Sequence, residues 1–115
     1  MKNRRAYVRY EASIAAEIEL RGETLEGETR DISEGGASVV FATVLPDGSK
    51  VALTLILRQD GIEDPDHEPF MTEALVMWSA PQDDGRSMTG LRFASISASQ
   101  KAQLKAFLAA RAKRS

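Results

Sequence analysis

A strict alternation of apolar and polar residues is the clearest pattern in the N-terminal half of the chain. Apolar side chains recur at every second position between residues 14 and 20, namely at Ile14, Ala16, Ile18 and Leu20. This period of two is typical of a half-buried β-strand with one wet face. Gly22 and Glu23 predict a turn, and a second strand follows over residues 24–30. The two strands predict a hairpin.

Four further strands follow, each bounded by turn residues. The pattern predicts them over residues 37–41, 51–57, 70–79 and 88–93. The strand over 70–79 is apolar on both faces: one face carries Thr72, Ala74, Val76 and Trp78, and the other carries Leu75 and Met77. Strands of this kind belong to a barrel or sandwich whose outer surface is covered.

A helix is expected at the C-terminus. Ser97 and Gln100 have the spacing of a capping box, and the apolar stripe that follows consists of Leu104, Phe107 and Leu108. The short stripe predicts a helix that lies on the barrel. The fold class is therefore all-β, a six-stranded antiparallel β-barrel with a C-terminal α-helix. We predict one domain over residues 1–115, with a flexible arm (1–11), a barrel (12–95) and a helix (97–112).

Composition excludes several classes of function. The chain has no cysteine, which excludes disulfides and thiolate metal sites. Its net charge of -2 argues against a general nucleic-acid coat, so anion recognition must be local. The acidic stretch over 59–69 contains the only histidine, His67, and lacks the ligand spacing of a calcium loop, so we interpret it as a solvated loop. No metal site and no catalytic residue are predicted.

The chain begins with charged residues, without the apolar segment of a secretory signal. The longest apolar-rich run, residues 51–57, is too short to span a bilayer. We therefore expect a cytoplasmic protein without membrane insertion.

The N-terminal arm is cationic and contains Arg4, Arg5 and Arg9. Arg5 and Arg9 share a side whether the arm is extended or makes one helical turn. Two guanidinium groups on one side suit a ligand with two phosphates. The alternative is a frayed basic terminus whose aromatic residues pack on the edge of the domain.

A polar and glycine-rich segment, residues 31–36, separates the second and third strands. Asp31 and Ser33 are two apart and would share one face of an extended backbone, about 7 Å from each other. An ionised aspartate can pair with the edge donors of a guanine base, and the glycines Gly35 and Gly36 would let a ligand approach the backbone. The alternative is an ordinary turn, in which Asp and Ser cap the backbone and the glycines supply positive φ.

Two later residues complete the candidate site. Trp78, the only tryptophan, is either a core or lid residue or a stacking surface for a base. Gly90 marks a bulge or a place where another backbone or a ligand comes near.

These features resemble the PilZ domain family, a bacterial receptor module for cyclic di-GMP with a split-barrel type of fold. The resemblance rests on Arg-x-x-x-Arg at residues 5–9, on Asp-x-Ser-x-x-Gly at residues 31–36, and on the segment from Gly90 to Phe93 in the last predicted strand. It implies that Arg5 and Arg9 bind the phosphates and guanine, and that Asp31 and Ser33 read guanine edges. Arg4 precedes the motif, where the family's arginine is associated with a stacked ligand pair.

The resemblance implies a non-enzymatic adaptor that needs no cofactor. The arm would close over the ligand and an unidentified downstream protein would sense it, with the adaptor a monomer or a ligand-dependent dimer. The alternative is a ligand-independent protein-interaction barrel. A small single-strand nucleic-acid binder is disfavoured by the aromatic content of 6%, and no nucleophile–base pair or carboxylate dyad indicates an enzyme.

Overall fold

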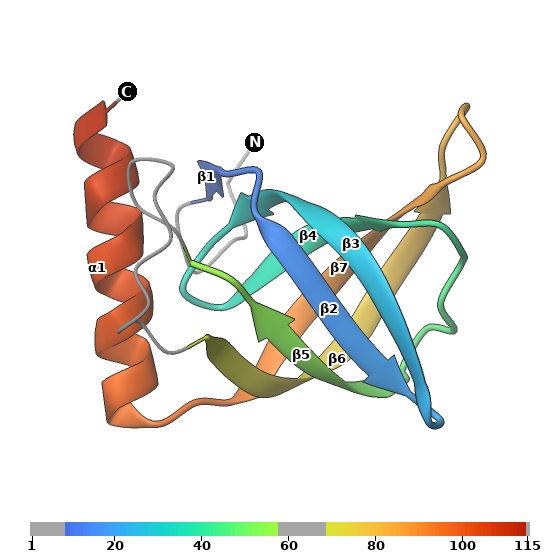
Figure 1. Cartoon of the computed structure of the whole chain (residues 1–115), viewed down its shortest axis with the longest axis horizontal. Helices are drawn as coiled ribbons and strands as arrows, with labels where there is room; N and C mark the ends of the chain where they lie inside the picture. Colours follow the sequence, from blue (N-terminus) through green and yellow to red (C-terminus); the bar gives the residue numbers. More distant parts are fainter. Residues whose placement is uncertain (1–8, 58–68, 115) are drawn as a thin grey trace, which may run out of the picture.

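The computed structural model describes residues 9–57 and 69–114, and the side chains up to residue 110. This part of the chain forms a barrel of strands with one helix beside it (Figure 1). The elements in chain order are β1 (Tyr10–Glu11), β2 (Ala15–Leu20), β3 (Glu23–Ile32), β4 (Gly36–Phe41), β5 (Lys50–Leu55), β6 (Phe70–Pro81), β7 (Ser87–Ser95) and α1 (Ala98–Arg114). Arg4, Arg5 and the acidic stretch with His67 lie outside the described residues.

Six strands form a closed antiparallel barrel, as the sequence predicts. Their order is β3-β2-β5-β6-β7-β4, and an additional pairing between β3 and β4 closes the ring. Among the described strands, the short strand β1 pairs with the end of β3 alone, where Glu11 lies opposite Asp31. The last two residues assigned to the arm are therefore part of the sheet.

The first hairpin follows the predicted alternation. Residues 12, 14, 16 and 18 are buried, and the residues between them (Ser13, Ala15 and Glu17) are exposed. The turn lies one residue earlier than predicted, at Arg21 and Gly22, which both have positive φ (54° and 82°). A two-residue turn of this kind matches the twist of the strands it connects.

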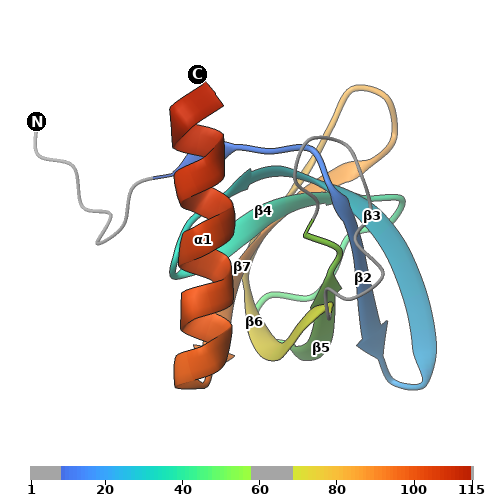
Figure 2. The same ribbon diagram turned by 60° about the vertical axis from the view of Figure 1, so that its left-hand side comes forward.

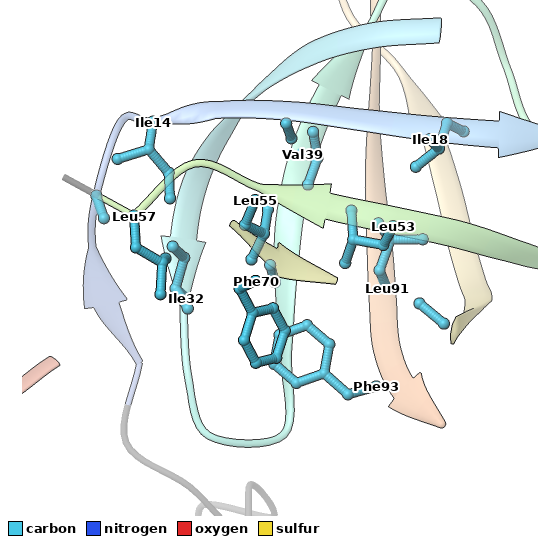
Figure 3. Close-up of a cluster of buried hydrophobic side chains, with 14 of the residues drawn as sticks. Ile14, Ile18, Ile32, Val39, Leu53, Leu55, Leu57, Phe70, Leu91 and Phe93 are labelled. Carbon is cyan, nitrogen blue, oxygen red and sulfur yellow. The ribbon is translucent and has the colours of Figure 1, made fainter. Parts of the chain in front are cut away.

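The barrel interior is filled with apolar side chains (Figure 3). The same buried cluster includes the apolar stripe of α1. Phe70 and Phe93 pack against each other within this interior, with ring centroids 5.2 Å apart and planes inclined by 53°. This tilted arrangement is a favourable geometry for aromatic pairs.

A bulge in β6 corrects the expected position of Trp78. The pairing with β7 shifts register between Val76 and Trp78, so that Val76 lies opposite Leu91 and Trp78 lies opposite Gly90. The extra residue at this point is Met77, and it reverses the facing of Trp78 relative to Val76. Val76 is buried, whereas Trp78 is 39% exposed on the outer wall. The prediction that Trp78 shares a face with Ala74 and Val76 was wrong.

Helix α1 runs alongside one end of the barrel, near β1 and the start of β6 (Figure 2). The capping box is confirmed: Ser97 Oγ accepts from the Gln100 N–H (3.2 Å), and Gln100 Oε1 accepts from the Ser97 N–H (2.9 Å). The predicted stripe of Leu104, Phe107 and Leu108 is buried. Within the described residues, no helix has both the length and the apolar character needed to cross a membrane.

Candidate ligand-binding site

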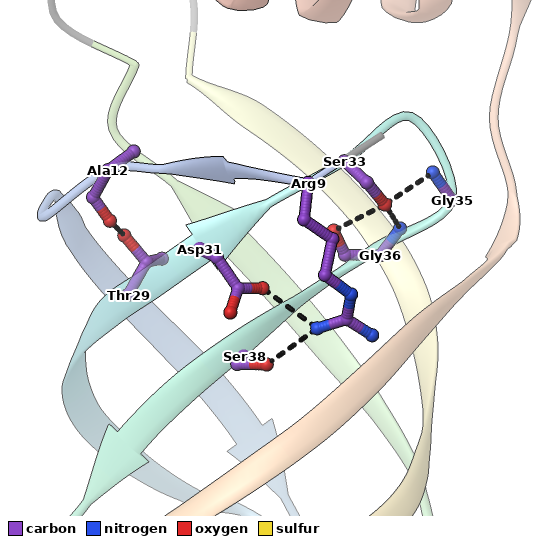
Figure 4. A network of polar contacts seen from close by, with 8 residues as sticks. All are labelled: Arg9, Ala12, Thr29, Asp31, Ser33, Gly35, Gly36 and Ser38. Carbon is purple, nitrogen blue, oxygen red and sulfur yellow. Dashed lines mark hydrogen bonds and ion pairs between the residues drawn. The ribbon is translucent and has the colours of Figure 1, made fainter. Parts of the chain in front are cut away.

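The candidate site begins where β3 ends between β1 and β4. Asp31 lies opposite Glu11 of β1 on one side and opposite Ser38 of β4 on the other. Arg9 directly precedes β1, so its side chain reaches across the outer wall of the barrel (Figure 4). Its Nη1 donates hydrogen bonds to Asp31 Oδ1 (2.9 Å) and to Ser38 Oγ (3.0 Å). The structure thus brings together two residues that the sequence assigned to separate motifs.

The contacts of Arg9 use only one edge of its guanidinium group. A guanidinium has five N–H donors, and the two on Nη1 are engaged. The other two nitrogens point away from Asp31 and Ser38 (Figure 4), and they have no partner among the residues that the structure describes. The arginine side chain is 32% exposed. The Nε–Nη2 edge can therefore bind an anion with two parallel hydrogen bonds while Nη1 keeps the side chain in place.

Four outward-facing residues form a row across four neighbouring strands. Asp31 pairs with Ser38, Ser38 pairs with Gly90, and Gly90 pairs with Trp78. Directly opposed residues share a face of a sheet, and neighbouring strands lie about 4.8 Å apart, so the row is about 14 Å long. At one end of the row lies the carboxylate of Asp31, which contacts Arg9. At the other end lies the half-exposed indole of Trp78. We refer to these four residues as the site row.

Ser33 has a structural task in the loop between β3 and β4. Its hydroxyl accepts hydrogen bonds from the backbone N–H groups of Gly35 (3.1 Å) and Gly36 (3.2 Å), and its side chain is largely buried. The Ser33 N–H donates to the Gly36 carbonyl (2.8 Å), which closes the turn. Ser33 therefore shapes this loop, as the turn alternative predicted.

Close packing, and not backbone conformation, explains the glycine at position 36. Neither Gly35 nor Gly36 has a positive φ, so that part of the turn alternative was wrong. A Cβ on Gly36 would lie 2.1 Å from the carbonyl oxygen of Leu91, which is far closer than atoms approach. Glycine at this position lets β4 approach β7 and aligns the site row across the two strands.

A buried threonine fixes the base of the arm. Thr29 lies in β3 and is fully buried; its Oγ1 accepts from the Ile14 N–H (3.0 Å) and donates to the Ala12 carbonyl (2.5 Å). These bonds span the break between β1 and β2.

A depression of about 420 Å³ beside this point is lined partly by Glu11 and Glu28, whose charge does not suit an anion.

Sequence reasoning missed Ser38 and Thr29. Ser38 is the only polar residue within the apolar run 37–41, and it lies two positions after Gly36, which was a usable signal. Its pairing with Arg9 joins residues 29 positions apart and could not be inferred locally. Two residues that the sequence did predict, Trp78 and Gly90, lie in the site row with Asp31. Arg9 contacts Asp31 and Ser38 of that row. Arg4 and Arg5 remain predictions because they lie outside the described residues.

These features define a small β-barrel domain whose candidate site lies on its outer wall and is flanked by an N-terminal arm. The sequence matches the family described as PilZ domain over residues 3–110. The chain belongs to the PilZ domain family.

Solved structures of similar fold agree with this assignment. The Bacillus subtilis inhibitor of motility MotI/DgrA has a TM-score of 0.79 at 24% identity, and the match covers 98% of this chain and 51% of that one. This chain thus spans about half the length of that protein. The PilZ domain of YcgR from Escherichia coli, solved with c-di-GMP, has a TM-score of 0.73 at 19% identity, with 97% and 94% of the two chains covered. No curated protein matches the sequence.

Proposed function

We propose that this domain is a receptor for cyclic di-GMP that acts as a non-enzymatic adaptor. The observation that carries the proposal is the open Nε–Nη2 edge of Arg9, held on the barrel wall by Asp31 and Ser38. This edge suits a phosphate, and the site row beside it offers a carboxylate and an indole for a base. The family membership supports the same ligand, since the YcgR PilZ domain was solved with c-di-GMP.

Each group then has a chemical role. Arg9 binds a phosphate through two parallel N–H donors. Asp31 accepts hydrogen bonds from the edge of a guanine, because its Oδ2 has no partner among the described residues. Trp78 provides a face on which a base can stack. Arg4 and Arg5 add positive charge from the arm, and Gly35 and Gly36 keep the loop low enough for the ligand to approach.

Closure of the arm would convert binding into a signal. Arg9 is held on the wall by Asp31 and Ser38, so it would form a fixed point from which residues 1–8 close over the nucleotide. Ordering a segment on binding couples affinity to conformational change. A downstream protein that recognises the closed arm would then sense the ligand.

Isothermal titration with cyclic di-GMP tests the proposal. Wild-type protein should bind, and Arg9→Ala should weaken binding about 10- to 100-fold, since hydrogen bonds to charged groups contribute about 1.5–3 kcal/mol. Asp31→Ala should also weaken binding and leave the circular dichroism spectrum unchanged, because the Asp31 side chain is on the outer wall and 27% exposed. Arg21→Ala, in the β2–β3 turn, is the matched control and should bind normally.

Two further readouts separate the proposal from its rivals. Binding should weaken as salt is added, because phosphate contacts are screened. The nucleotide should be recovered intact by chromatography after incubation, and its hydrolysis would contradict an adaptor role. Absence of binding by the wild-type protein, or equal binding by Arg9→Ala, would refute the receptor assignment.

The ligand-independent interaction barrel is supported by a different observation. Met77 and Trp78 are adjacent, apolar, and 49% and 39% exposed on the outer wall. Such residues also suit a protein partner. This alternative predicts partner binding that is unaffected by cyclic di-GMP and by Arg9→Ala.

A further inference from the structure

Gly90 lies under the indole of Trp78. The two residues are directly opposed on β7 and β6, immediately after the β6 bulge. A Cβ added to Gly90 would lie 2.3 Å from both Cε2 and Nε1 of Trp78 and 2.9 Å from Cδ1. Atoms do not approach so closely, so the pyrrole part of the indole occupies the space that a side chain at position 90 would need.

The backbone does not require glycine at this position. Gly90 does not have positive φ, unlike Gly22, Gly48 and Gly85. Alanine could therefore adopt the same backbone conformation, and the three atoms nearest to its Cβ would all belong to the indole of Trp78. This separates Gly90 from Gly36, whose added Cβ would meet the backbone of Leu91.

The position of the indole matters because of its neighbours in the site row. On the other side of Gly90 lies Ser38, whose hydroxyl accepts from Arg9. The indole on β6 thus lies two strands away from β4, which carries the Ser38 contact of Arg9. A side chain at position 90 would lift or rotate the ring and change its height and tilt relative to the guanidinium.

We propose that Gly90 is a positioning residue that sets the orientation of Trp78, so that the indole presents one face to a base whose phosphate is bound by Arg9. The proposal rests on the proposed function and assigns to Gly90 a role through Trp78, without contact to the ligand. It also explains why a glycine occurs within a strand, where it otherwise weakens pairing.

A double-mutant cycle on the whole domain tests the proposal, with cyclic di-GMP as the probe. Gly90→Ala should weaken binding about 10-fold, within the range measured for loss of base–aromatic stacking. Trp78→Ala should weaken binding by a similar factor. In the Trp78→Ala background, Gly90→Ala should have no further effect, because there is no ring left to displace.

Fluorescence supplies a readout that does not depend on the ligand. Trp78 is the only tryptophan, so the emission maximum and the access of a soluble quencher report on this ring alone. Gly90→Ala should shift the emission and change quenching. Gly22→Ala is the matched control: an added Cβ there meets no atom within 4 Å but has a strained φ of 82°. It should lower stability and leave emission and affinity unchanged.

The outcomes distinguish the two proposals. If Gly90→Ala weakens binding equally with and without Trp78, or leaves emission unchanged, the positioning role is wrong. If the wild-type protein does not bind cyclic di-GMP but the emission shift occurs, the function fails while the steric relation between Gly90 and Trp78 stands. Should Gly90→Ala unfold, the double variant should recover the melting temperature of Trp78→Ala, and a failure to recover would overturn the proposal.

Discussion

Replacement of Thr29 by valine tests whether one buried hydroxyl secures the base of the arm. Valine has nearly the same shape and keeps the branched side chain, so packing inside the barrel is preserved. The hydroxyl is lost, and with it the bonds to the Ile14 N–H and the Ala12 carbonyl. Both residues are about 5% exposed, so water cannot readily replace the missing partner.

The magnitude follows from the two groups left without a partner. An unsatisfied buried polar group costs about 1–3 kcal/mol, and the two groups are close enough for their costs to overlap, so we expect a loss of about 2–4 kcal/mol. For a domain of this length a loss of that size lowers the melting temperature by about 8–17 °C. Amide exchange at Ile14 should accelerate more than exchange at the centre of β5, since the change is local.

Thermal and urea unfolding of three variants checks this reasoning. Thr29→Ser keeps the hydroxyl and removes one methyl group, which costs about 1 kcal/mol. Thr24→Val, on the exposed part of β3, should have little effect. The expected order of stability is wild type, Thr29→Ser, Thr29→Val. If Thr29→Val is more stable than Thr29→Ser, packing of the methyl group and not the hydrogen bonds decides the role of Thr29.

Two further predictions concern the strands around the site. Gly36→Ala should lower the free energy of unfolding by about 1–3 kcal/mol, because the new Cβ would force β4 away from the Leu91 carbonyl. A melting temperature equal to that of the wild type would contradict the close packing. In the β6–β7 hairpin, the Arg86 side chain donates a hydrogen bond to Asp84 and lowers the pKa of that carboxyl below its ordinary 3.8. The stabilisation by this pair is therefore present at neutral pH and is lost as pH falls through the lowered pKa of Asp84. A carboxyl titration of Asp84 by NMR should show a midpoint below 3.8 that rises in Arg86→Ala, and an unchanged midpoint would refute this pairing.

The elements with local causes were predictable from the sequence. The alternation in β2 gave its buried face, because side chains of a strand point to opposite faces at every step. The capping box of Ser97 and Gln100 gave the start of α1, because its bonds join residues three positions apart. The spacing of the motifs at residues 5–9 and 31–36 indicated the family, and its barrel fold was confirmed.

Tertiary structure decided how the candidate residues are used. Trp78 lies on the outer wall only because pairing with β7 inserts a bulge at Met77, and a bulge depends on the partner strand. Gly36 must be glycine because Leu91, 55 positions later, lies against it. Arg9 meets Asp31 and Ser38 because β1 pairs with the distant end of β3, where the β3–β4 hairpin places Ser38 beside Asp31. Local sequence determines which residues can form strands, a helix and an anion site, whereas register between distant strands determines which of them meet.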